Sequence, residues 1–192
     1  MRVIVGISGA TGAIYGIRLL EVLRDLEVET ELIISEWGAR NVRIETSYDI
    51  EEVKALATVT HPIDDQAAAV SSGSHRVDAM FVVPCSMRTL ACIATGTGDN
   101  LIHRSADVVL KERKPLVLAT RETPLNEIHL ENMLKLSRMG VSIMPPMPAF
   151  YNRPESLQDL IDHFVARLLD QVGLETDLTK RWRTPSRGRD DR

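Results

Sequence analysis

Residues 1–20 read MRVIVGISGATGAIYGIRLL, and the class of fold can be inferred from them. Arg2 to Ile7 (RVIVGI) is short, β-branched and bounded by glycine, which predicts a buried strand. From Ile14 onward apolar residues recur at helical spacing. Three closely spaced glycines mark the junction: Gly6 near the end of the strand, and Gly9 and Gly12 between the two elements. The stretch therefore predicts a strand, a glycine-rich loop and a helix in direct succession.

The same alternation of strand and helix continues along the chain. Further strands are expected at Glu29–Ile34, Ala79–Val83, Pro115–Ala119 and Val141–Met144, and residues 66–76 are expected to form a loop. Helices are expected at Trp37–Glu45, Asp49–Ala57, from Cys85-Ser86 onward, at about Asp99–Arg113, Leu125–Met139 and Glu155–Val172. This alternation, with strands apolar on both faces, indicates an α/β fold with a doubly wound parallel sheet.

Length and composition favour a single globular domain, placed at residues 1–178 of the 192. Residues 179–192 form a basic, polar tail that we expect to be largely disordered. A net charge of −4 argues against nucleic acid as a partner, and no apolar run is long enough to cross a membrane. The two cysteines form neither a metal motif nor a disulfide framework, so a cytoplasmic protein is expected.

Parallel sheets of this kind bind ligands outside the carboxyl ends of their strands. The glycine loop there carries the hydroxyls of Ser8 and Thr11, which would suit a phosphate or a flavin edge. The other interpretation is a tight turn that needs glycine only for its backbone conformation. A second polar junction, PCSMRTL (residues 84–90), follows another strand. There Ser86 either caps a helix or shares a ligand with the first loop, and the pairing favours a phosphorylated cofactor.

Several cations lie near apolar helix faces or strand ends. Arg104 and Lys111 are seven residues apart, so they share one face of a helix. Arg167 adjoins the apolar stripe of the last helix, and Arg121 directly follows a strand. For Arg121 we favour a ligand-binding role. The other three could meet a ligand phosphate or a neighbouring carboxylate, since an unpaired buried charge is costly.

Two further side chains are candidates for chemistry. Tyr151 lies in the stiff, proline-rich loop MPPMPAFYNRP (residues 144–154) and could donate a hydrogen bond to an anion or simply pack. Glu45 ends a helix near a strand tip and is a candidate acid or base, although a glutamate there is often only solvated. No metal is expected, because the five histidines form no ligand pattern and no D-D-x-x-D motif occurs.

In this order the motifs resemble the UbiX-like flavin prenyltransferases. The matching segments are GISGATGAIYG, Ser35, ET at 45–46, SSGS at 71–74, PCSMRTL, RSADVVLKERKPLVLATRETPL, IHLENMLKLSRMG and MPPMPAFYNRPESL. They span about residues 2–182. The combination of ETPLNEIHLENML with PPMPAFYNRPESL looks most like the family members that accompany hydroxyarylic (phenolic) acid decarboxylases.

The resemblance implies a flavodoxin-like, three-layer α/β/α fold that binds FMN and assembles into a homo-oligomer, typically a dodecamer. It implies transfer of a dimethylallyl group from dimethylallyl monophosphate to N5 and C6 of reduced FMN. The product, prenylated FMN, is the cofactor of UbiD-like decarboxylases. Loss of the phosphate develops negative charge, which Arg, Lys and Tyr donors can stabilise without a metal.

The resemblance also assigns residues. FMN contacts fall on Gly9, Ala10, Thr11, Ser35, Ser86, Met87, Arg88, Thr89 and Arg121. Catalytic or phosphate-binding positions fall on Glu45, Arg104, Lys111, Arg121, Glu122, Tyr151 and Arg167. Arg104 and Lys111 are expected to approach the substrate phosphate across a subunit interface, with Tyr151 and Arg167 within or beside the site. Glu45 is expected to accept or relay a proton.

The chain departs from the family at two points. Thr11 stands where many relatives have serine, and Gln66 lies where some place a tryptophan near the prenyl site. The flavin-dependent cysteine decarboxylases are a weaker match, because their P-A-S-A-N-T segment reads PCSMRT here. A non-catalytic FMN-binding subunit or flavin carrier is the alternative from a different class, but it would need none of Glu45, Tyr151 or Arg167.

Overall fold

The computed structural model describes residues 1–182, so the expectation for the tail beyond Trp182 lies outside the described residues. Its centre is a parallel six-stranded sheet of order β3-β2-β1-β4-β5-β6. The strands are β1 (Arg2–Ile7), β2 (Glu29–Ile34), β3 (Val59–His61), β4 (Ala79–Cys85), β5 (Leu116–Thr120) and β6 (Ser142–Ile143). The predicted doubly wound sheet is confirmed, and its strand order is that of the Rossmann arrangement.

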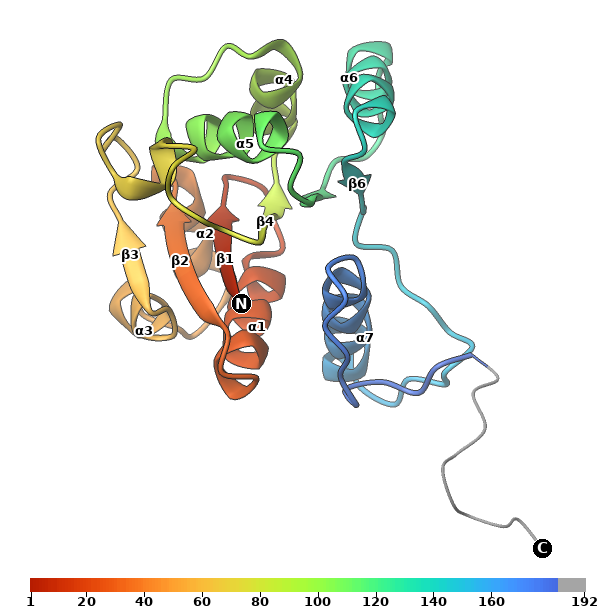
Figure 1. Ribbon diagram of the computed structural model, residues 1–192. Helices are drawn as coiled ribbons and strands as arrows, with labels where there is room; N and C mark the ends of the chain where they lie inside the picture. The colour runs from red at the N-terminus through yellow and green to blue at the C-terminus, as the bar shows by residue number, and fades with distance from the viewer. Residues whose placement is uncertain (183–192) are drawn as a thin grey trace, which may run out of the picture.

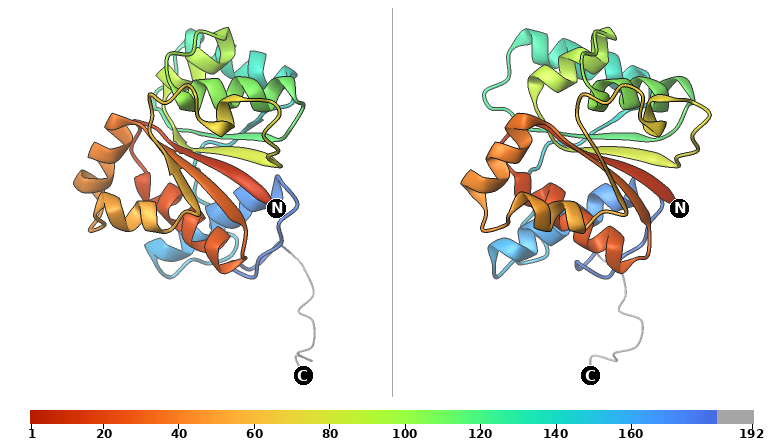
Figure 2. Two further views of the ribbon diagram at one scale, coloured as in Figure 1. Left: turned by 60° about the vertical axis from the view of Figure 1, so that its left-hand side comes forward. Right: turned by 90° about the vertical axis from the view of Figure 1, so that its left-hand side faces the viewer.

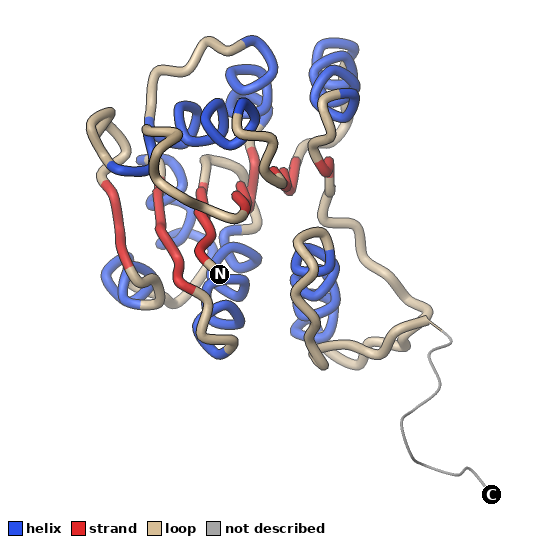
Figure 3. Tube along the Cα trace, viewed as in Figure 1, coloured by secondary structure: helices blue, strands red, loops and turns tan. Residues whose placement is uncertain are grey.

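Helices cover both faces of the sheet and complete the predicted three layers (Figures 1 and 2). One layer holds α1 (Ala13–Asp25), α2 (Glu36–Glu45), α3 (Ile50–Ala55) and α7 (Leu157–Asp170). The other holds the one-turn helix η1 (Ala69–Ser71), α4 (Met87–Thr95), α5 (Leu101–Lys111) and α6 (Glu127–Arg138). Helices separate all the strands except β3 from the next strand, two helices follow both β2 and β4, only the one-turn η1 lies between β3 and β4, and a long loop joins β6 to α7 (Figure 3).

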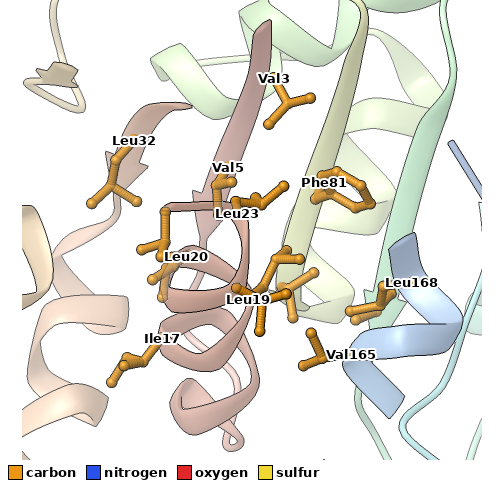
Figure 4. Close-up of a cluster of buried hydrophobic side chains, with 14 of the residues drawn as sticks. Val3, Val5, Ile17, Leu19, Leu20, Leu23, Leu32, Phe81, Val165 and Leu168 are labelled. Carbon is orange, nitrogen blue, oxygen red and sulfur yellow. The ribbon is translucent and has the colours of Figure 1, made fainter. Parts of the chain in front are cut away.

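The central strand β1 shows why the sheet is buried on both sides. Val3, Val5 and Ile7 point into a cluster with α1 and α7, whereas Ile4 belongs to the cluster beneath α4 and α5. This is the two-residue period of a strand. Figure 4 shows the first cluster, in which Leu19 and Leu23 of α1 and Leu168 of α7 lie against the strands. Because both faces are covered, the strand sequences are almost continuously apolar.

Polar residues before the first helical turns determine where most helices begin. The side chains of Ser35, Ser86 and Asn100 each accept a hydrogen bond from a backbone N–H of the helix that follows. The expected loop at 66–76 contains η1, and the short edge strand β3 was not predicted. Within residues 1–182 no helix is both long enough and apolar enough to span a bilayer.

The glycine-rich stretch brings α1 unusually close to the sheet. A Cβ atom at Gly16 would collide with the backbone oxygen of Val83 in β4, so only glycine fits there. β1 and β4 are the neighbours at which the winding of the sheet reverses. In such sheets the crevice at the carboxyl ends of these two strands is where ligands bind.

Candidate functional site

Two hollows lie at the carboxyl edge of the sheet, one on each side of the glycine loop. The first, of about 430 Å³, is the α2–α4 hollow, lined by residues that include Gly9, Ser35, Trp37, Ser86, Thr89 and His103. The second, of about 460 Å³, is the β5–β6 hollow, lined by residues that include Thr11, Tyr15, Arg121, Glu122, Pro146 and Met147. Both volumes are in the range of small-molecule sites.

The α2–α4 hollow is where three helices begin. The N-cap residues of α2, α4 and α5 (Ser35, Ser86 and Asn100) all line it. The first N–H groups of a helix have no partner within the helix, and the helix dipole favours an anion there. Arg88 adds a cation at the rim, paired with Asp99 at 3.0 Å. The hollow therefore suits a phosphate group.

Ser8 has a structural role instead of the ligand-binding role that its position in the loop suggested. Its hydroxyl donates to the backbone oxygen of Pro84 (2.9 Å) and accepts from the backbone N–H of Ser86 (2.8 Å). Ser8 is 1% exposed. These two bonds tie the end of β1 to the end of β4, so Ser8 holds the two ligand-facing loops together.

The glycine loop is fixed from below by α2. Asn41 donates to the backbone oxygen of Ala10 (2.9 Å), and Glu45 accepts from the backbone N–H groups of Gly12 (2.8 Å) and Ala13 (3.0 Å). Gly12 has a positive φ of 101° and caps α1 without a side chain. Glu45 therefore supplies the carboxylate that the start of α1 otherwise lacks.

Gly9 is required for a different reason, the close packing of the loop against α2. A Cβ atom at position 9 would lie 2.5 Å from the Cβ atom of Trp37.

The β5–β6 hollow contains the other predicted residues at this edge. Arg121 and Glu122 are exposed at its wall, and Thr11 faces them across it. The backbone N–H of Arg121 donates to the oxygen of Cys85, which joins this wall to the end of β4. The hydroxyl of Thr120 is buried here without a hydrogen-bond partner among residues 1–182. The hollow thus combines one cation, Arg121, with one carboxylate, Glu122, and several hydroxyls, which suits a polar ligand.

His103 was missed in the sequence, where it reads as one residue of a helix. It is 3% exposed and lines the α2–α4 hollow, and neither ring nitrogen makes a hydrogen bond among the described residues. Asp99 Oδ1 lies 3.2 Å from its Nδ1, outside hydrogen-bond geometry. Burial lowers the pKa of His103 below its ordinary value, although Asp99 opposes the shift. The only feature of the sequence that could have revealed this role of His103 is its place on the apolar face of α5.

Two of the predicted FMN contacts do not offer a side chain to the α2–α4 hollow. Met87 packs against the core beneath α4 and α5, so it can contribute only its backbone at the start of α4. Ala10 is buried and does not line either hollow. The remaining predicted contacts, Gly9, Thr11, Ser35, Ser86, Arg88, Thr89 and Arg121, line one hollow or the other.

Arg104 and Lys111 share a face of α5, as the spacing indicated, but they line neither hollow. Each has a carboxylate partner within the chain: Arg104 pairs with Asp107 at 2.8 Å and Lys111 with Glu112 at 2.5 Å. Both cations lie beside the loop at residues 71–74, where Arg104 Nε donates to the oxygen of Ser71 (3.1 Å).

Tyr151 and Arg167 lie on the loop before α7 and on α7 itself, and they too line neither hollow. The Tyr151 hydroxyl is 3.4 Å from His163 Nε2, and its ring packs edge-on against those of His163 and Trp182. Arg167 donates to Asp170 at 2.6 Å. A single chain therefore presents two separate sets of site residues, the carboxyl-edge set and the two outlying pairs.

The hollows fit a flavin mononucleotide on chemical grounds. A phosphate would find the helix starts at Ser35 and Ser86, and the His103 ring beside Asp99 provides a further polar contact. The flavin ring would extend along the glycine loop, where Gly9 allows close approach to the backbone. Within residues 1–182 no three His, Cys, Asp or Glu side chains are grouped to hold a metal ion.

Comparison with known proteins places the chain among flavoproteins. Residues 1–169 match the sequence model of the Flavoprotein family. A relative from Bacillus subtilis (strain 168), named "Probable UbiX-like flavin prenyltransferase", is 58% identical over 182 residues, which is 95% of this chain and 89% of the relative.

Two solved structures are similar over nearly the whole chain. A dodecameric FMN-dependent UbiX-like decarboxylase from Escherichia coli O157:H7 has a TM-score of 0.94 at 55% identity, covering 96% of this chain and 100% of that one. A structure described as AnUbiX (PadA1) in complex with FMN and dimethylallyl pyrophosphate has a TM-score of 0.94 at 54% identity, covering 95% and 97%.

Proposed function

The chain belongs to the UbiX-like flavin prenyltransferase family, and on that premise we propose that it transfers a dimethylallyl group from dimethylallyl monophosphate to reduced FMN. New bonds form at flavin N5 and C6, phosphate leaves, and the product is prenylated FMN. The observation that carries the proposal is the meeting of three helix N-termini in one hollow beside the glycine loop capped by Glu45.

Reduced FMN supplies an electron-rich ring that attacks the allylic carbon, and the chain's own residues hold and orient it. The first turns of α2 and α4 bind the FMN phosphate, with Ser35, Ser86 and Thr89 at the contact. Gly9, Ala10 and Thr11 lie along the ring, and Arg121 faces it from the end of β5. Fixing both reactants side by side at the carboxyl edge of the sheet supplies much of the rate enhancement.

The departing phosphate needs positive charge, because its negative charge grows as the allylic C–O bond breaks. Arg104, Lys111, Tyr151 and Arg167 supply cations and a hydroxyl donor, and Arg121 adds a cation at the edge of the sheet. The first four line neither hollow of their own chain, which supports the proposal that Arg104 and Lys111 reach the phosphate across a subunit interface. We therefore propose a homo-oligomer, a dodecamer by analogy with the Escherichia coli structure.

Two carboxylates complete the site. Glu45 lies at the start of α1, directly beneath the glycine loop, and accepts the proton released as the new ring closes. Glu122 lies beside Arg121 in the β5–β6 hollow, where its Oε1 accepts a hydrogen bond from the backbone N–H of Thr123 (3.1 Å). Carboxylates held at a strand tip are suited to proton transfer because backbone groups fix their position.

Several wider assignments belong to the same proposal. The catalytic domain comprises residues 1–178, which is supported by the family match over residues 1–169. The protein works in the cytoplasm and delivers prenylated FMN to a UbiD-like hydroxyarylic acid decarboxylase.

The test is anaerobic incubation of the protein with chemically reduced FMN and dimethylallyl monophosphate, followed by mass spectrometry of the extracted flavin. A mass gain of one C5H8 unit is expected. The diphosphate, supplied in parallel, measures the preference between the two donors. Unmodified FMN, recovered from protein that binds it, would contradict prenyl transfer and favour a flavin carrier.

A further inference from the structure

A buried carboxylate on β2, Glu31, has no part in the site described above. Glu31 is 5% exposed and lies on the side of β2 that faces α5 and η1, as Ile33 does. Its Oε1 lies 2.5 Å from His75 Nε2, and its Oε2 lies 2.6 Å from His61 Nε2. The guanidinium of Arg2 is the third group nearby, with Nε 3.8 Å from Oε1.

These contacts keep Glu31 charged. Burial by itself would raise the pKa of Glu31, but the hydrogen bonds with His75 and His61 outweigh it and hold the pKa below its ordinary value. A charged carboxylate with little exposure is stable only when its oxygens are paired. Glu31 therefore joins three segments, β2, the end of β3 and the residue that follows the loop at 71–74.

That loop is packed against the cations assigned to the donor phosphate. Arg104 Nε donates to the oxygen of Ser71 (3.1 Å). Gly73 is so close to the ion pair of Lys111 and Glu112 that a Cβ there would collide with both side chains. Movement of the loop would consequently move Arg104 and Lys111, which are otherwise exposed on α5.

We propose that Glu31, through its hydrogen bonds to His61 and His75, is a positioning residue that fixes the loop at 71–75 and so holds Arg104 and Lys111 in place for the phosphate of the prenyl donor. The inference rests on the proposed function. Glu31 touches neither hollow, so its effect reaches the donor only through the loop. Hydrogen bonds to a charged group are strong enough to act as such an anchor.

The test uses the full chain loaded with FMN and the variants His75→Ala, His75→Gln and Glu31→Gln. We expect His75→Ala to weaken binding of dimethylallyl monophosphate about tenfold, which is about what the loss of one hydrogen bond to a charged group costs. The Kd for FMN should stay unchanged. Amide hydrogen exchange over residues 71–75 should accelerate. His75→Gln retains an N–H donor toward Glu31 and should recover most of the lost affinity.

Glu29→Gln is the matched control, because Glu29 lies on the same strand, is exposed and pairs with Arg2. It should change neither donor affinity nor exchange in the loop. Unchanged donor affinity in both His75→Ala and Glu31→Gln would overturn the inference, as would a parallel loss of FMN affinity. Wild-type protein that binds the donor without prenylating flavin would overturn only the proposed function. Wild-type protein that does not bind the donor would overturn both.

Discussion

The carboxylate of Glu45 caps the first turn of α1, with Oε2 2.8 Å from the backbone nitrogen of Gly12. Glu45 is the last residue of α2, and its side chain caps α1 and so fixes the glycine loop that precedes α1. The proposed proton acceptor is therefore held by the backbone of the glycine loop, and suitable substitutions are needed to separate its structural role from its chemical one.

Glu45→Gln and Glu45→Ala should separate these roles. The alanine variant leaves the first N–H groups of α1 unpaired and should lower the free energy of unfolding by about 1 kcal/mol, as loss of a helix cap does. The glutamine variant keeps an acceptor oxygen and should lose less. Both should reduce prenyl transfer by at least about 100-fold, because neither can accept a proton. Denaturation and flavin mass spectrometry measure the two effects, and wild-type turnover in the glutamine variant would exclude the proton role.

Tyr151→Phe and Arg167→Ala should leave FMN binding intact and lose turnover, since both residues lie outside the hollows of their own chain. Asp170 keeps both hydrogen bonds from Arg181 (2.9 and 2.6 Å) when Arg167 is removed, so α7 should remain folded. FMN titration and single-turnover assays measure the two outcomes. Arg138→Ala, on the exposed face of α6, is the control and should change neither. If both variants abolish FMN binding, the division of the site into flavin and phosphate contacts is mistaken.

Ser8→Ala should weaken both the fold and FMN binding. The variant leaves the N–H of Ser86 without its acceptor, at a cost of about 1–3 kcal/mol in unfolding free energy. The Pro84 oxygen loses the hydroxyl but keeps the hydrogen bond from the backbone N–H of Ser8 (3.2 Å). Because these bonds hold the ends of β1 and β4 together, the Kd for FMN should rise. Chemical denaturation and flavin fluorescence titration check this. Ser137→Ala, exposed on α6, should be silent in both measurements, and a Ser8→Ala protein with wild-type FMN affinity would contradict the role.

His103 should make the protein less stable in mild acid. Burial lowers its pKa in the folded state from the ordinary value of 6.5, so the unfolded chain binds more protons as pH falls below that value. The contribution is present above about pH 6.5 and is lost as pH falls toward the lowered pKa. Denaturation between pH 5 and pH 8 should show a shallower pH dependence in His103→Asn than in the wild type. An equal slope in the two proteins would assign the acid sensitivity to other groups.

The sheet could be predicted from the sequence because each βα unit carries local signals. β-branched runs fill both faces of β1 and β4, and a serine or asparagine precedes α2, α4, α5 and α7. β3 was missed because Val59–His61 has only three residues, none of them buried, at the edge of the sheet. A strand of that kind is formed by its pairing with β2 and leaves little pattern of its own.

The site could be predicted only in part. Residues that follow strands had to meet at one edge, because the carboxyl ends of parallel strands lie together, and Gly9, Ser35, Ser86 and Thr89 do so. The hydrogen-bond partners of individual side chains could not be predicted, because a hydroxyl or an imidazole bonds to whichever groups the fold brings near it. The sequence left open whether Ser8 contacts a ligand, and in the structure its hydroxyl joins the ends of two strands.

The sequence by itself therefore determined the α/β class, the succession of strands and helices along the chain, and the family. These depend on periodicity, capping residues and motifs that are contiguous in the chain. Only the tertiary structure decided that Glu45 caps α1, that His103 is buried in the hollow and that Glu31 joins His61 to His75. Each of those relationships joins residues distant in sequence or depends on packing around the residue. No local pattern records such contacts, because they exist only once the sheet and its helices have packed.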